Sequence, residues 1–368
     1  MNEGVRAWRA PGRVNLIGEH TDYNLGFVLP VALDLASRIT TTPVDDRRLH
    51  VFSEVENEER EWPVEQLREL RPQHHWTDYV IGVAQELIRE GYPIEPMFLR
   101  IASTVPEGSG LSSSAALEVS SALALLDGRP IGKLELAKLC QRAEVGFVGL
   151  PVGIMDQYAS VFGVEHAALK IDCRTLEHET VKLPDGVEFL AVNSMVKHAL
   201  ASSAYRQRTE ECAAAVRALQ SRFAEVKSLR DATLEQLEQV VMPPVVAKRA
   251  RHVVTEDVRV SRFVAACRKG DLPEMGRLFV ESHRSLQQDY EVSCAELDFL
   301  VDAALGMEGV YGARMTGGGF GGCTVNMMRP DAAHRFSERI LRAYQERFGV
   351  EAQIYDCRPS AGAGEITL

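Results

Sequence analysis

Short hydrophobic runs separated by polar turns fill the first hundred residues, which is the pattern of β-strands. Strands are expected at 14–17, 27–33, 37–42, 49–53 and 97–102. A helix is expected at 77–90, because Gly91 and Pro93 end it. From residue 187 the pattern changes to longer helices between strands, including 202–223, the region 287–298 and 332–348, and this change indicates a second domain.

A glycine- and serine-rich stretch at 106–112 runs into an alanine- and leucine-rich segment that continues to Leu126. Gly108 and Gly110 allow close backbone approach or positive φ, and the serines at 112–114 can cap the helix or donate hydrogen bonds. Free amides in a first helical turn bind anions, so a polyphosphate is the expected occupant. The alternative is a flexible connector. No Gly-Lys-Ser/Thr closes a P-loop frame, so a nucleotide would be held without that lysine.

The turn-rich loop at 18–26 places Glu19, His20, Asp22 and Asn24 within six positions between two expected strands. Two carboxylates and an imidazole at strand ends suit a pocket for a polyhydroxylated molecule. A solvated hairpin loop is the alternative interpretation of the same residues.

Acidic residues recur later in the chain. Asp156 follows a turn containing Pro151 and Gly153 and stands at the expected start of a short helix, where capping is one role for it. Glu144 lies on an amphipathic helix expected at 134–147, where a lone glutamate ordinarily faces solvent.

Three glycines, Gly317, Gly319 and Gly322, satisfy the Gly-x-Gly-x-x-Gly dinucleotide frame. The segment that follows, 323–328, reads as a strand where that motif requires a helix. We therefore interpret the loop as a tight β-turn that backs a cleft.

Composition limits the class of protein. The 368 residues are 45% hydrophobic and 25% charged, which favours a well-packed protein of two domains. A net charge of −11 without long runs of one sign argues against nucleic-acid binding. Seven scattered cysteines without a Cys-x-x-Cys indicate reduced thiols and no zinc site. No signal peptide or membrane span is visible, so a cytoplasmic location is expected.

Three motifs in order resemble one family. Residues 11–29 resemble the galactokinase signature, and 106–116 resemble the phosphate loop of the wider family of galactokinase, homoserine kinase, mevalonate kinase and phosphomevalonate kinase (GHMP). Residues 312–322 resemble the last motif of that family. Further stretches similar to galactokinases are 151–157, 171–176, 193–204 and 281–298.

The resemblance implies an α+β fold of two domains, the GHMP-kinase fold. An N-terminal domain similar to ribosomal protein S5 would span 1–175, and a ferredoxin-like domain 176–368, with its last residues packed back on the first domain. The resemblance also implies a site that binds a sugar, ATP and Mg²⁺. The sugar would contact Glu19, His20, Thr21, Asp22, Gly153 and Tyr205; ATP would contact Ser53, Trp76, Pro106, Glu107, Gly108, Ser109, Gly110, Leu111, Ser112, Ser113 and Ser114; Mg²⁺ would be held by Ser112 and Glu144.

The implied reaction is transfer of the ATP γ-phosphate to the anomeric hydroxyl of α-D-galactose. Asp156 would remove the hydroxyl proton or only orient the hydroxyl, and Arg13 would stabilise the transferring charge. Glu107 departs from the family pattern and adds negative charge near the phosphates. The alternatives are a kinase for N-acetylgalactosamine, galacturonate or arabinose, and a regulator that senses galactose and ATP. A monomer is expected, with neither nucleic acid nor membrane as a partner.

Overall fold

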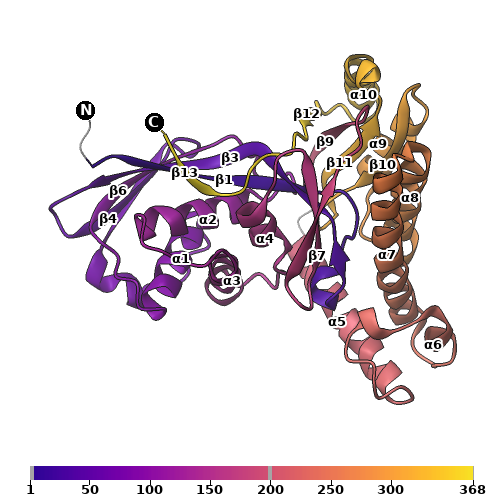
Figure 1. The fold of residues 1–368 in the computed structure, drawn as a ribbon, viewed down its shortest axis with the longest axis horizontal. Coiled ribbons are helices and arrows are strands. Elements are labelled where there is room, and N and C mark those ends of the chain that lie inside the picture. The colour runs from indigo at the N-terminus through magenta and orange to yellow at the C-terminus, as the bar shows by residue number, and fades with distance from the viewer. Residues whose placement is uncertain (1–3, 198–200, 368) are drawn as a thin grey trace.

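The computed structural model describes residues 4–197 and 201–367, so part of the family-like stretch at 193–204 lies outside the described residues. Within this part of the chain, helices pack on three β-sheets (Figure 1). The strands are β1 (Arg6–Asn15), β2 (Phe27–Val28), β3 (Pro30–Pro43), β4 (Arg48–Ser53), β5 (Glu58–Pro63), β6 (Met97–Ser103), β7 (Ala167–Asp172), β8 (Glu177–Lys182), β9 (Glu188–Lys197), β10 (Val310–Met315), β11 (Gly321–Met328), β12 (Gln353–Asp356) and β13 (Gly364–Ile366). The α-helices are α1 (Thr77–Arg89), α2 (Ser113–Leu126), α3 (Lys133–Ala143), α4 (Met155–Phe162), α5 (Ala201–Gln220), α6 (Leu234–Glu238), α7 (Pro244–Lys269), α8 (Leu272–Ser285), α9 (Ala295–Leu305) and α10 (Ala333–Phe348).

The largest sheet has the strand order β13-β1-β3-β6-β4-β5. Strands β4 and β6 run parallel, whereas the other neighbours are antiparallel. Strand β13 comes from the far end of the sequence and pairs with β1, with Glu365 opposite Trp8. The first and last strands of the chain therefore lie side by side in this sheet (Figure 1).

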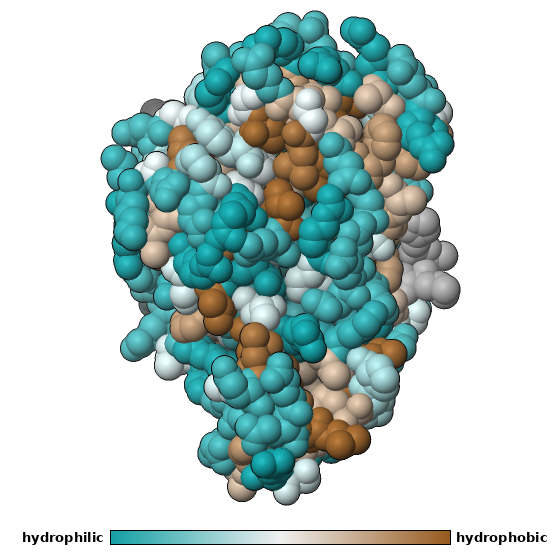
Figure 2. Space-filling model, turned by 90° about the vertical axis from the view of Figure 1, so that its right-hand side faces the viewer, coloured by the Kyte–Doolittle hydropathy of each residue, from teal (hydrophilic) through white to brown (hydrophobic). Residues whose placement is uncertain are grey.

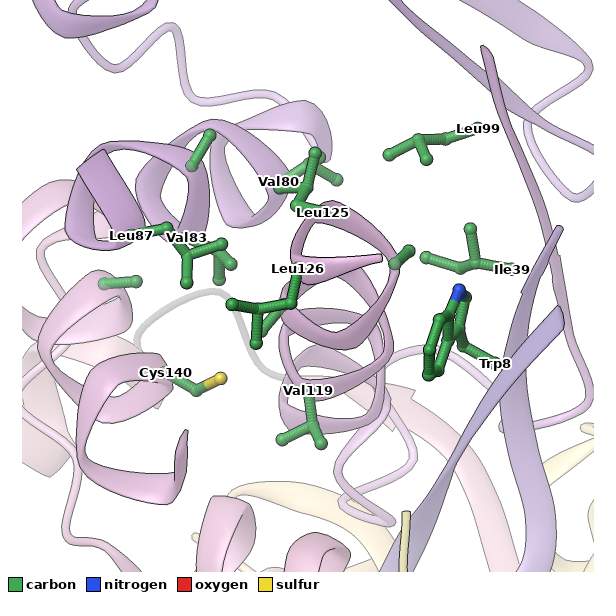
Figure 3. Packing of buried hydrophobic residues seen from close by; sticks show 14 of the residues in the cluster. Trp8, Ile39, Val80, Val83, Leu87, Leu99, Val119, Leu125, Leu126 and Cys140 are labelled. Atoms are coloured by element: carbon green, nitrogen blue, oxygen red, sulfur yellow. The ribbon is translucent and has the colours of Figure 1, made fainter. Parts of the chain in front are cut away.

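Helices α1, α2 and α3 cover one face of the large sheet. Figure 3 shows Val80 of α1 and Leu125 of α2 in the same cluster as Trp8, Ile39 and Leu99 of the sheet. Each of these side chains is buried, and deleting a buried leucine typically costs about 2–5 kcal/mol. Helix α2 is thus held firmly, and the loop that precedes it is held at a defined place.

A second group of elements surrounds the four-stranded sheet, whose order is β10-β11-β9-β12. Helices α8, α9 and α10 pack around it, and the long helix α7 runs beside α8 (Figure 1). The side chains of Val14 and Leu16 lie in a hydrophobic cluster with Val260 and Phe263 of α7 and Cys323 of β11. The segment after β1 therefore shares a core with both halves of the molecule. A third sheet has the order β2-β7-β8.

The face formed on the side of α7 and α8 is mostly hydrophilic, with hydrophobic side chains in separate small areas (Figure 2). Over residues 4–197 and 201–367, every helix falls short of the length or the apolarity that crossing a bilayer requires.

Several expected elements have different bounds. The strand expected at 14–17 overlaps only the last two residues of the longer β1, and the one expected at 27–33 is divided at Leu29 between two sheets. The helix expected at 134–147 ends at Ala143 and continues as a π-helical turn from Glu144 to Val148. Such turns interrupt α-helices frequently at functional sites.

The region 287–298 was expected among the longer helices, but it is helical only at 287–290 and 295–298, with a break at 291–294. A π-helical turn ends at Tyr290, and Glu291 adopts a left-handed conformation with φ 54°. Arg208 holds this break, because its Nε donates to the carbonyl of Tyr290 (2.7 Å) and its Nη2 to that of Glu291 (2.8 Å). A distant arginine therefore ends the helix before α9 begins.

Candidate functional site

A polar cavity of about 320 Å³ takes most of its lining from four segments that are distant in the sequence. They are the loop after β1, the loop before α2, the turn before α4 and the glycine-rich loop before β11. The lining residues are Arg13, Glu19, His20, Asp22, Tyr79, Gly108, Gly110, Ser112, Ser113, Ser114, Glu144, Val152, Gly153, Met155, Asp156, Tyr205, Gly317 and Gly318. Most of the polar residues expected at a sugar and phosphate site are therefore gathered here.

Arg13 and Asp156 form a two-pronged ion pair in this cavity. The Nε and Nη2 atoms of Arg13 donate to Oδ1 and Oδ2 of Asp156 at 2.8 and 2.7 Å. Burial lowers the pKa of Arg13, but the charge and hydrogen bonds of Asp156 outweigh it and raise the pKa overall. Ser112 Oγ donates to the same carboxylate at 2.5 Å. Helix α4 begins at Met155, so Asp156 lies within its first turn and not at the N-cap position. Its carboxylate binds Arg13 and does not cap the helix.

The loop before α2 presents backbone amides to the cavity. Gly108 and Gly110 have φ values of 66° and 80°, and Ser112 precedes the helix in the left-handed conformation. Ser112 was expected as a possible cap, but its hydroxyl donates to Asp156 and no side chain caps α2. The first-turn amides beside Ser113 thus keep the partial positive charge of a helix N-terminus at the cavity wall.

Asp22 projects into the cavity against the backbone of Gly153. A Cβ at Gly153 would overlap the Asp22 carboxylate, so any other residue there would displace that carboxylate. Burial, reinforced by the charge of Asp156, raises the pKa of Asp22 to about 7. Its carboxylate is therefore close to half protonated at neutral pH.

Glu19 connects the first loop to the glycine-rich loop. It accepts hydrogen bonds from Thr316 Oγ1 (3.0 Å), the Gly317 amide (2.6 Å) and the side chain of Asn15. Burial raises the pKa of Glu19, while the positive charge of Arg314, 3.7 Å away, opposes that rise. These contacts fix the carboxylate rigidly at the cavity edge.

His20 and Tyr205 form the aromatic side of the cavity, with ring centroids 5.4 Å apart. Tyr23 Oη lies 2.8 Å from His20 Nδ1, and burial lowers the pKa of His20 to about 3, so the imidazole is neutral. Thr21 was expected to touch the sugar. Its hydroxyl instead donates to the carbonyls of Gly18 and Phe27, so this side chain holds the loop together.

A second cavity of about 210 Å³ adjoins the first and shares Tyr79, Gly108, Ser113 and Ser114 with it. Three residues expected at a nucleotide, Ser53, Trp76 and Glu107, line it. Trp76 Nε1 donates to Glu58 at 3.1 Å, which sets the plane of the indole. Tyr79, one helical turn after Trp76, borders both cavities, and sequence reasoning missed it because an aromatic at that spacing is usually core.

The remaining expected nucleotide residues shape the loop. Ser109 Oγ donates to the carbonyl of Pro106 at 2.7 Å, and Leu111 lies in the hydrophobic cluster beneath the loop. Arg13 Nη1 also donates to the carbonyl of Gly110 at 2.5 Å. Arg13 therefore connects the loop to Asp156.

Glu144 begins the π-helical turn and reaches the first cavity, as does Ser112. Burial, followed by the charge of Asp156, raises the pKa of Glu144 to about 7. Gln157 Nε2 donates to Glu144 Oε2 at 2.6 Å. A carboxylate and a hydroxyl beside an anion-binding loop are the hard oxygen ligands that Mg²⁺ prefers, so this set of donors fits that ion.

Comparison with known proteins places the chain in a family. Residues 78–164 match the model of the GHMP kinases N terminal domain, 263–346 that of the GHMP kinases C terminal, and 2–43 the galactokinase galactose-binding signature. The galactokinase of Roseiflexus sp. (strain RS-1) is 45% identical, covering 97% of this chain and 92% of that protein. The Thermotoga maritima galactokinase is 42% identical, covering 97% and 99%.

Comparison with solved structures points to the same family. Lactococcus lactis galactokinase complexed with galactose has a TM-score of 0.94 and 34% identity, covering 99% of this chain and 96% of that one. Methanococcus jannaschii mevalonate kinase shares the fold, with a TM-score of 0.71 and 17% identity over 98% and 100%. The chain belongs to the galactokinase family of the GHMP kinases.

Proposed function

We propose that this protein is a galactokinase, which transfers the γ-phosphate of ATP to the anomeric hydroxyl of α-D-galactose and releases galactose 1-phosphate and ADP. The observation that carries the proposal is the ion pair of Arg13 and Asp156, which stands between an acidic, hydroxyl-binding cavity and an anion-binding loop. The relatives named galactokinase, at 41–45% identity over nearly the whole chain, support the same reaction.

The sugar is proposed to lie in the first cavity with its anomeric hydroxyl at Asp156. Asp22, once ionised, accepts from sugar hydroxyls, and the neutral His20 adds a directional hydrogen-bonding group. Besides the hydrogen bonds that it accepts within the protein, the Glu19 carboxylate has lone pairs that can accept a further hydrogen bond from a sugar hydroxyl. A site built on such bonds can reject an analogue that lacks one of them by as much as ~10⁴-fold. Thr21 acts by shaping the loop.

ATP is proposed to lay its phosphates over the loop at 106–114 and its adenine beside Trp76 and Ser53 in the second cavity. Ser112 and Glu144 would hold Mg²⁺, which when bound neutralises charge on the phosphates. A hydroxyl can donate to Asp156 and still offer a lone pair to a cation, so the two contacts of Ser112 are compatible. Glu107 faces the same cavity and adds a negative charge near the nucleotide.

Phosphoryl transfer depends on positioning and on stabilising developing charge. Asp156 is oriented by three donated hydrogen bonds, two from Arg13 and one from Ser112. In this environment it orients the sugar hydroxyl and accepts its proton late in the transfer. Arg13 remains beside the reacting oxygen and stabilises negative charge on the transferring group.

Substitution of the ion pair tests this assignment. Asp156→Asn and Arg13→Ala should each lower kcat by at least ~10²-fold, from the ranges for general-base and charge-stabilising groups. Exposed Asp185→Asn and Arg38→Ala are the matched controls. Near-normal turnover by both active-site variants would refute the assignment.

The division into domains at residue 175, the monomeric state and the cytoplasmic location are also proposals. The seven cysteines are free thiols, which supports a reducing compartment. Light scattering at working concentration tests the oligomeric state.

A further inference from the structure

Two fully buried polar side chains lie behind Glu144 and outside both cavities. Glu118 comes from α2 and Gln157 from α4, and each is 0% exposed. Gln157 Nε2 donates to Glu118 Oε2 at 2.9 Å and to Glu144 Oε2 at 2.6 Å. Because the ionised carboxylate of Glu144 can only accept hydrogen bonds, the Gln157 atom beside it must be the NH₂ of the amide, and both of its hydrogens are used.

The remaining oxygens of these two side chains have no hydrogen-bond partner within the described part of the chain. They are Glu118 Oε1 and Gln157 Oε1. Buried polar atoms in native proteins are nearly always satisfied, so a pair of unsatisfied acceptors on two bonded side chains requires an explanation. A single proton on Glu118 explains both unsatisfied oxygens. As a carboxylic acid, Glu118 has an O–H that can donate to the amide oxygen of Gln157.

Electrostatics favour the same protonation state. An ionised carboxylate without a cation is very costly in a buried site. Burial raises the pKa of Glu118 well above its usual value. Over residues 4–197 and 201–367, the hydrogen bond that Glu118 accepts comes from an amide N–H, which compensates little of that cost.

We propose that Glu118 is a permanent carboxylic acid that pairs head to head with the amide of Gln157, and that this pair positions Glu144 for the cation. In the pair, the amide N–H donates to the acid carbonyl and the acid O–H donates to the amide carbonyl. The second amide hydrogen then holds one oxygen of Glu144. The positioning role rests on the proposed function of Glu144, whereas the acid–amide pair does not.

Infrared spectroscopy in D₂O tests the pair without reference to activity. A protonated carboxylic acid has a carbonyl band separate from those of carboxylates and amides. At pH 8.5 the protein should show such a band, Glu118→Gln should lose it, and Glu144→Gln should keep it. Ser121→Ala is the matched control, because Ser121 is also a buried, unpartnered polar residue of α2. Absence of the band, or its persistence in Glu118→Gln, would overturn the pair.

Cation binding tests the positioning role. Glutamine at 118 can make the same two hydrogen bonds, so Glu118→Gln should keep the Mg²⁺ concentration for half-maximal activity within about twofold of wild type. Glu118→Met cannot, and it should raise that concentration about tenfold or more, the usual effect of losing a group that orients a metal ligand. Mn²⁺ binding with ADP, followed by electron paramagnetic resonance, should show the same order of affinities.

The outcomes separate the two ideas. If Glu118→Gln is as defective as Glu118→Met, the negative charge of Glu118 matters and the acid is refuted. Equal, wild-type Mn²⁺ binding by both variants would refute positioning. If Glu144→Ala also binds Mn²⁺ normally while the infrared band persists, the proposed role of Glu144 fails and the pair stands. If Glu118→Met fails to fold, the infrared band of the wild-type protein and its loss in Glu118→Gln still show whether the acid–amide pair exists.

Discussion

Replacing Asp22 by asparagine should stabilise the protein while it weakens galactose binding. The pKa of Asp22 rises from 3.8 to about 7 on folding, mainly because burial disfavours the charged form. Below pH 4 the carboxyl of Asp22 is protonated in both the folded and the unfolded state, so its pKa shift does not change the free energy of unfolding. Between pH 4 and 7 the unfolded state ionises first, so the folded state loses stability as pH rises, and above pH 7 the loss is complete.

The magnitude follows from the shift. A change of roughly 3 pKa units corresponds to about 4 kcal/mol at 1.36 kcal/mol per unit. At about 2.1 cal/mol/K per residue, the chain has an unfolding entropy near 0.8 kcal/mol/K, so Asp22→Asn should raise the Tm by about 5 °C at pH 7.5. The increment should shrink toward zero near pH 4.

Differential scanning calorimetry from pH 4 to 8 measures this increment, with exposed Asp185→Asn as the control. Added galactose should raise the Tm of the wild-type protein, and much less that of Asp22→Asn, because binding only to the folded state stabilises it. A Tm of Asp22→Asn at or below that of wild type at pH 7.5, or an increment independent of pH, would show that folding does not raise the pKa of Asp22.

Three further outcomes follow from the site. The kcat/KM for galactose should fall about tenfold per pH unit below pH 7, since the free enzyme must ionise Asp22, and a flat pH–rate profile would contradict this. Gly153→Ala should raise the KM for galactose at least tenfold, because its Cβ displaces the Asp22 carboxylate; unchanged saturation kinetics would exclude that clash. Arg314→Met should lower stability by about 3–5 kcal/mol, measured as a lowered Tm, because it removes the nearer of the two cations that act on buried Glu19; an unchanged Tm would show that Arg314 is dispensable.

Local signals in the sequence were enough to locate both loops of the site. The glycines at 108 and 110 take the positive φ expected of them, and the acids at 19 and 22 border one cavity. Hydrophobic pattern also placed the strand at 97–102 and the helix at 77–90 within one residue or two. These features depend on neighbours in the chain, which a sequence displays directly.

Features that depend on distant contacts were not visible in the same way. Arg13 and Asp156 are 143 positions apart, and only the family resemblance joined them before the structure. The helix break at Glu291 is held by Arg208, which no local pattern shows. Glu118 resembles an ordinary helix residue until burial leaves it with Gln157 as its partner.

The most direct test of the account is ADP release from Mg-ATP by the purified protein, measured with galactose, glucose, N-acetylgalactosamine, galacturonate, arabinose and mevalonate. We expect strong turnover with galactose alone and a product phosphorylated at the anomeric oxygen. Preference for another acceptor would contradict the proposed substrate. No turnover with any of them, while galactose and ATP still raise the Tm, would contradict the proposed kinase activity and favour a regulator that senses galactose and ATP.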